Sequence, residues 1–133
     1  MVDIFQKYIE CFENLDENNI DELLSCMSDK IIFIDPFNKL VGKYKVNSML
    51  RYMFKKLKNP NFKIIYKTKN RELKIVKWKF SCEFLKKKIQ FFGLSEIEVK
   101  DNFVIRHEDY WDSGRNFYCN FPIVGNLFKV IHK

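Results

Sequence analysis

A run of alternating side chains at residues 73–85 constrains the fold of this chain more than any other feature. Successive side chains of a β-strand point to opposite faces, so a half-buried strand alternates apolar and polar residues. The run places Val76, Trp78, Phe80, Cys82 and Phe84 against Lys77, Lys79, Ser81 and Glu83. Similar segments predict three more long strands, at 62–69, 89–100 and 103–112, the last two joined by a tight turn at Asp101-Asn102.

Apolar residues three and four positions apart predict amphipathic helices before these strands. Asp3 is placed to cap the first helix, Pro36 ends a β-branched strand, and Asn59-Pro60-Asn61 ends the longest helix. A last helical spacing occurs at 122–131. The elements predicted before the long strands are, in order, a helix at 5–12, a helix at 20–27, a strand at 30–35 and a helix at 43–57.

This order predicts an α+β protein, with helices packed on one face of a curved sheet. A chain of 133 residues has the size of one domain, so we expect a single domain over residues 1–133. Hydrophobic residues make up 47% of the chain, which excludes a disordered protein. No apolar run reaches the roughly 18 residues of a membrane span, and residues 1–12 lack the pattern of a signal peptide. We therefore expect a cytoplasmic protein without membrane insertion.

Cysteine and histidine are too scattered to indicate a metal site. No CxxC pair occurs among the cysteines at positions 11, 26, 82 and 119, and His107 and His132 are the only histidines. We expect reduced, mostly buried thiols, no metal and no cofactor.

Positive charge is concentrated in the middle of the chain. The whole chain has a net charge of +7, whereas residues 43–88 hold 16 basic and 2 acidic side chains. Such a block suggests an anionic partner. However, 20 of the 24 basic residues are lysine, which lacks the forked donors that read bases or phosphates. Nucleic acid is therefore an unlikely partner, and a solvated lysine face is the competing interpretation.

Four segments, taken in order, resemble the nuclear transport factor 2-like, or SnoaL-like, superfamily, which has the ketosteroid isomerase-like fold. The segments are KYIECFENLDENNIDELLSCMSDKIIFIDPF, VGKYKVNSMLRYMF, FFGLSEIEVKDNFVIRHEDYWD and FPIVGNLFKVI. The resemblance implies a cone-shaped α+β fold, in which a strongly curved, mostly antiparallel sheet wraps around the N-terminal helices. It also implies a homodimer. The fold hosts isomerases, cyclases, epoxide hydrolases, dehydratases and binding modules, so it does not fix the function.

Asp35 is the first candidate for chemistry. Ile31, Phe33 and Asp35 share one face of the predicted strand. If that face is internal, apolar walls raise the pKa of Asp35 towards the range of a general base. The resemblance implies that Asp35 is the proton-abstracting base of ketosteroid isomerases. The alternative is that Asp35 only caps the turn before Pro36.

The last strand holds the densest set of candidates. His107, Asp109 and Trp111, together with Phe103 and Ile105, are predicted to share one face. The resemblance implies that Asp109 is the acid or base of SnoaL-like cyclases and limonene-epoxide hydrolases, and His107 is placed to flank the same small substrate. The alternative is a structural polar network.

Further ligand-binding residues are predicted around these candidates. Tyr8 lies on the inward stripe of the first helix, where the resemblance implies a hydrogen-bond donor like that of the isomerases. Ser95 stands where those enzymes have a second acid. The alternative for Tyr8 is a core tyrosine with its hydroxyl hydrogen-bonded. The predicted ligand-binding residues are Tyr8, Phe33, Trp78, Ser95 and Trp111.

Two functions follow from these patterns. One is cofactor-free proton transfer (isomerisation, cyclisation or hydration) on an apolar small molecule, with Asp109, Asp35 and His107 as the catalytic residues. The other is a non-catalytic ligand-binding or dimerisation module, whose lysine block meets an anionic partner. We expect any homodimer to use later strands, with Phe92, Leu94 and Tyr110, because Lys63, Lys67 and Lys69 are predicted to share one face of an earlier strand.

Overall fold

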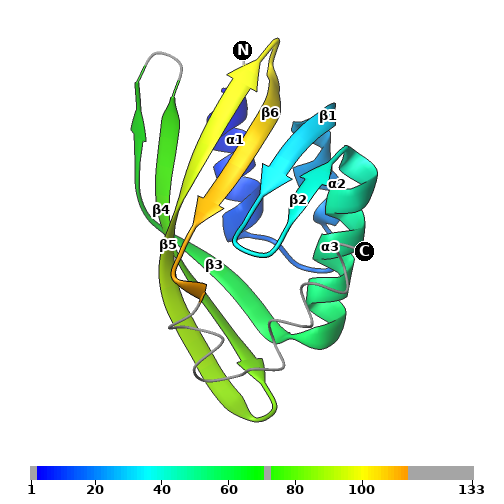
Figure 1. Ribbon diagram of the computed structural model, residues 1–133, viewed down its shortest axis with the longest axis vertical. Coiled ribbons are helices and arrows are strands. Elements are labelled where there is room, and N and C mark those ends of the chain that lie inside the picture. The colour runs from blue at the N-terminus through cyan, green and yellow to red at the C-terminus, as the bar shows by residue number, and fades with distance from the viewer. Residues whose placement is uncertain (1–2, 71–72, 114–133) are drawn as a thin grey trace.

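The computed structural model describes residues 3–70 and 73–113, which form three helices and one six-stranded sheet (Figure 1). The strand order is β2-β1-β6-β5-β4-β3, in which β1 and β6 run parallel and all other neighbours are antiparallel. The sheet is strongly curved and not closed, and the helices lie on its concave side. The elements are α1 (Ile4–Glu13), α2 (Ile20–Ser25), β1 (Met27–Ile34), β2 (Lys39–Val41), α3 (Lys43–Lys56), β3 (Lys58–Lys69), β4 (Lys74–Phe84), β5 (Lys87–Lys100) and β6 (Phe103–Tyr110).

The predicted α+β class and the order of elements are confirmed. The structure adds the short strand β2, and it ends α2 at Ser25, so that Met27 begins β1 instead of closing the helix. Strand β3 begins at Lys58 and therefore includes Pro60, close to the start of an edge strand, where a proline costs no ladder bond. The helix predicted at 122–131 and the cysteine at position 119 lie outside the described residues.

Helix α1 is fixed to the sheet at its start. The Asp3 side chain accepts a hydrogen bond from the Phe5 backbone N–H at 3.0 Å and caps the helix, as predicted. The same carboxylate forms an ion pair with Lys69 of β3. This ion pair lowers the pKa of Asp3. The cap thus directs the apolar stripe of α1, including the fully buried Tyr8, at the concave face of the sheet.

Extra residues in two strands change which side chains face inwards. Ile65 is unpaired in β3, so Lys63 lies opposite Lys79, whereas Lys67 lies opposite the buried Val76. The prediction that Lys63, Lys67 and Lys69 share one face is therefore wrong. A one-residue shift between paired strands reverses every side chain beyond it.

The same effect corrects one residue of the last strand. Ile105 is the unpaired residue of β6, because Arg106 pairs with Glu98 while Val104 pairs with Val99. Val104 is consequently fully buried, and Phe103 is 45% exposed. The prediction that Phe103 shares the face of His107 is wrong.

The convex face of the sheet carries large apolar side chains. Phe92, Leu94 and Tyr110 are all more than one-third exposed. A homodimer through this face stays a prediction, as does an anionic partner of the lysine block. None of the helices among the described residues is long and apolar enough to cross a membrane.

Candidate functional site

A cavity of about 90 Å³ lies between the helices and the concave face of the sheet. All eight predicted site residues line it: Tyr8, Phe33, Asp35, Trp78, Ser95, His107, Asp109 and Trp111. The structure therefore places these side chains around one cavity, and their role in binding or catalysis stays a prediction. Four aromatic walls were missed as site residues, namely Phe12, Phe62, Phe80 and Phe91. Phe80 and Phe12 were recognisable, since they share the strand face of Trp78 and the helix stripe of Tyr8.

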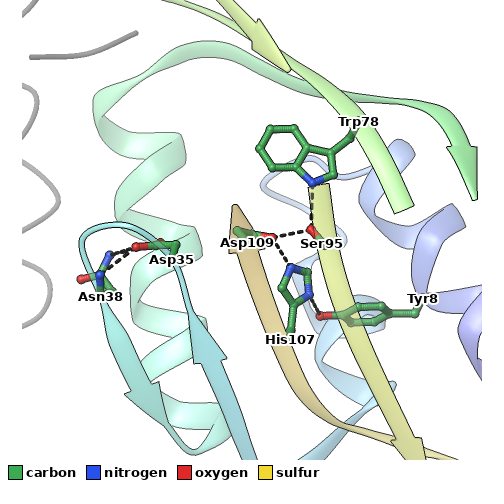
Figure 2. A network of polar contacts seen from close by, with 7 residues as sticks. All are labelled: Tyr8, Asp35, Asn38, Trp78, Ser95, His107 and Asp109. Carbon is green, nitrogen blue, oxygen red and sulfur yellow. Dashed lines mark hydrogen bonds and ion pairs between the residues drawn. The ribbon is translucent and has the colours of Figure 1, made fainter. Parts of the chain in front are cut away.

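A chain of hydrogen bonds crosses the cavity wall (Figure 2). The Tyr8 hydroxyl lies 2.7 Å from His107 Nδ1, and His107 Nε2 lies 2.6 Å from Asp109 Oδ1. From the other side, Trp78 Nε1 donates to Ser95 Oγ at 2.8 Å, and Ser95 Oγ donates to the same Asp109 oxygen. Five predicted residues from four separate elements thus form one network.

The partners determine where each proton lies. An indole N–H only donates, so Ser95 Oγ accepts from Trp78 and gives its own proton to Asp109. Burial, followed by the charge of Asp109, raises the pKa of Tyr8 well above its usual value, so the phenol keeps its proton. His107 Nε2 donates to Asp109 Oδ1, and His107 Nδ1 lies next to the Tyr8 hydroxyl. Ser95 Oγ and His107 Nε2 therefore both donate to Asp109 Oδ1.

This convergence leaves the second oxygen of Asp109 available. Within the described part of the chain, Oδ2 accepts no hydrogen bond, and the side chain is 15% exposed. The orientation of the imidazole is also fixed from the side, because the Phe33 ring stacks on His107 with centroids 4.4 Å apart. The site thus holds a carboxylate in one orientation, with one oxygen committed to the protein and one uncommitted.

Asp35 is held separately, in the turn that follows β1. Its Oδ1 accepts hydrogen bonds from the backbone N–H groups of Phe37 at 2.8 Å and Asn38 at 2.7 Å. Burial, followed by the charge of Asp109, raises the pKa of Asp35, although these hydrogen bonds act in the opposite direction. The predicted rise of the pKa is confirmed, and so is the alternative prediction that Asp35 caps its turn. The same side chain does both.

An Asp35→Asn variant is expected to gain stability over the wild type as the pH rises from about 4 to about 7. The native state binds the Asp35 proton more tightly than the unfolded chain does. Its contribution is therefore complete below the ordinary pKa of 3.8 and is lost as the pH passes through the raised pKa. Asparagine keeps the cap and does not titrate. Melting temperatures measured across this range test the prediction, with Asp101→Asn in the exposed β5–β6 turn as the matched control. A difference that falls with pH would contradict it.

Cys11 and Cys82, the two described thiols whose pKa is shifted, are not suited to act as nucleophiles. Burial raises the pKa of Cys11 to about 11 and the pKa of Cys82 to about 12, so both stay protonated near neutral pH. Over residues 3–70 and 73–113, no three His, Cys, Asp or Glu side chains converge as a metal ion would require. The chemistry available to the cavity therefore resides in Tyr8, Asp35, His107 and Asp109.

Comparison with known proteins identifies the fold. No family model and no curated protein matches the sequence. A protein of ketosteroid isomerase-like fold from Catenulispora acidiphila, solved in complex with trimethylamine, superposes with a TM-score of 0.74 at 8% identity, covering 86% of this chain and 88% of the other. An LEH-like epoxide hydrolase from M. tuberculosis gives 0.72 at 16% identity, covering 96% and 88%. A putative polyketide cyclase from Pseudomonas putida gives 0.69 at 11% identity, covering 82% and 89%.

These similarities show that the chain has the ketosteroid isomerase-like, or NTF2-like, fold, as the sequence predicted. At such low identities they show the fold alone, because this fold carries many unrelated activities. The function has to be argued from the cavity.

Proposed function

We propose that this protein binds an apolar small molecule in the cavity and catalyses a cofactor-free proton transfer on it. The observation that carries the proposal is the hydrogen-bond chain that converges on Asp109 Oδ1 and leaves Oδ2 without a partner among the described residues. A positioned carboxylate in an aromatic cavity is suited to remove or return a proton. The solved structures described as an epoxide hydrolase and a putative polyketide cyclase support an enzymatic use of this fold.

The two carboxyl groups suit different roles. Asp109 is held in one orientation through Oδ1 and keeps Oδ2 uncommitted, which suits the base that takes the proton from carbon. The raised pKa of Asp35 suits a group that can take up a proton and return it to oxygen. His107 and Ser95 position Asp109, and His107 also couples it to the Tyr8 hydroxyl. Isomerisation and cyclisation use this division of roles, and hydration uses it with the base acting on water instead of carbon.

Exchange of carbon-bound protons tests the proposal without knowledge of the natural substrate. A panel of small cyclic ketones is incubated with the protein in D₂O, and loss of the α-proton signal is followed by NMR. We expect Asp109→Asn to slow exchange by about 10²–10⁴-fold, the usual contribution of a general base. Asparagine keeps an oxygen that accepts from His107 and Ser95, so the variant retains the network that positions the side chain.

Asp101→Asn is the matched control, because it makes the same change in the exposed turn between β5 and β6. Exchange that survives in Asp109→Asn at the wild-type rate would refute the role of Asp109. Saturable binding of a ketone without any exchange would instead favour the non-catalytic ligand-binding module.

A further inference from the structure

The charge of the cavity is opposite to that of the chain. The protein has 24 Lys and Arg residues and a net charge of +7, yet no Lys or Arg is among the described residues that line the cavity. The titratable groups that face it are Tyr8, Asp35, His107 and Asp109. Two of these four groups are carboxyl groups, and neither Lys nor Arg lies among the described lining residues to offset them. An anionic ligand would meet repulsion here and no counter-charge.

The rest of the wall consists largely of aromatic rings. Phe91 stacks on Trp111 with centroids 4.5 Å apart and forms a T-shaped contact with Trp78, with centroids 6.0 Å apart. Phe62 continues this wall, with its centroid 5.8 Å from that of Trp78. The face of an aromatic ring carries partial negative charge and attracts a cation, most strongly when water is excluded. The carboxylates and the ring faces therefore favour the same kind of ligand.

The volume of the cavity and the small number of oxygen atoms in its wall restrict which cations can bind there. A volume of about 90 Å³ is well below the roughly 300–1,000 Å³ of sites for drug-sized ligands, so the group it holds is compact. A bare Ca²⁺ or Mg²⁺ ion requires about six oxygen ligands, and the apolar walls do not supply them. A cation that carries methyl groups can contact the aromatic rings through these groups, while its positive charge interacts with the carboxylates.

We propose that the ligand of this cavity carries a small organic cation of the alkylammonium class, seated between the aromatic rings and the carboxylates of Asp35 and Asp109. This inference rests on the proposed function only in treating the cavity as a ligand site. Under it, the positive group lies next to the uncommitted oxygen of Asp109, and the apolar part of the ligand contacts the rings.

Two probes that differ in charge but hardly in shape test this inference. Tetramethylammonium and tert-butanol each have a central atom bearing four non-hydrogen substituents, and only the first is charged. The full chain, labelled with ¹⁵N, is titrated with each probe near pH 7, with sodium chloride holding the ionic strength constant. We expect tetramethylammonium to shift the indole N–H signals of Trp78 and Trp111 saturably, with an affinity at least tenfold tighter than that of tert-butanol.

Variants locate the binding. Asp35→Asn and Asp109→Asn should each weaken tetramethylammonium binding at least tenfold and leave tert-butanol unaffected, and Asp101→Asn should change neither. If Asp109→Asn does not fold, the affinity of Asp35→Asn for tetramethylammonium alone tests the inference. If tert-butanol binds as tightly as the cation, the cavity remains a ligand site but the cation inference is wrong. If neither probe shifts the two indole signals, both the inference and the ligand site are overturned.

Discussion

Replacement of His107 by alanine is expected to lower the free energy of unfolding by about 3–5 kcal/mol. The imidazole is 4% exposed, and both of its nitrogens are hydrogen-bonded. Its loss leaves the hydroxyl of the fully buried Tyr8 without that partner, which costs about 1–3 kcal/mol, and removes a donor from a carboxylate, which costs about 1.5–3 kcal/mol. Urea unfolding measures the change.

Tyr8→Phe is the matched variant for this prediction. It removes the hydroxyl and breaks the bond to His107 Nδ1, but it keeps the ring and the bond between His107 and Asp109. The expected loss is about 1–3 kcal/mol, because the buried His107 Nδ1 is left without this partner. If His107→Ala cost no more than about 0.5 kcal/mol, as an exposed substitution does, the network would have no structural role.

Replacement of Gly93 by alanine is expected to cost about 2–4 kcal/mol. Gly93 lies opposite Trp78 on the concave face of the sheet, and the indole ring covers it. A methyl group at this position would lie 2.9 Å from Trp78 Cζ3 and closer still to Cη2 and Cζ2. Trp78 is buried and wedged against Phe62 and Phe91, so the ring has to move. Its hydrogen bond to Ser95 is then lost as well.

Urea unfolding and the fluorescence of the tryptophans report this displacement. Gln90→Ala, at an exposed position of the same strand, is the control and should stay within about 0.5 kcal/mol of the wild type. A Gly93→Ala protein as stable as that control, with unchanged fluorescence, would show that Trp78 has room to shift and does not depend on the glycine.

The sequence predicted the fold and the site well where a period of two or of 3.6 residues is unbroken. The alternation through Trp78 and the stripe through Tyr8 assigned both side chains to the interior. Prediction failed at Phe103 and at Lys67 because one unpaired residue in each strand reverses the faces. Nothing local marks Ile65 or Ile105 as that residue, since a bulge is set by the pairing with a neighbouring strand.

The roles of the aspartates were also predictable only in part. For both Asp35 and Asp109, the sequence offered a functional and a structural interpretation as alternatives. The structure shows that a side chain can carry both, since Asp35 caps its turn while it faces the cavity, and Asp109 completes a network while one oxygen stays uncommitted. The bonds that produce this arrangement join residues up to 99 positions apart, and no local pattern encodes them.

The parallel pairing of β1 with β6 has a consequence during synthesis. Strand β1 acquires this neighbour only after nearly the whole described chain has been made. His107, the hydrogen-bond partner of Tyr8, is synthesised 99 residues after it. At ribosomal rates of roughly 5–20 residues per second, this delay lasts roughly 5–20 s. During that time, one edge of β1 has no native partner, whereas α1 already has its neighbours α2 and β3. The nascent chain therefore exposes that edge of β1 until β6 emerges, and a chain truncated before β6 would lack His107, Asp109 and Trp111 of the cavity wall.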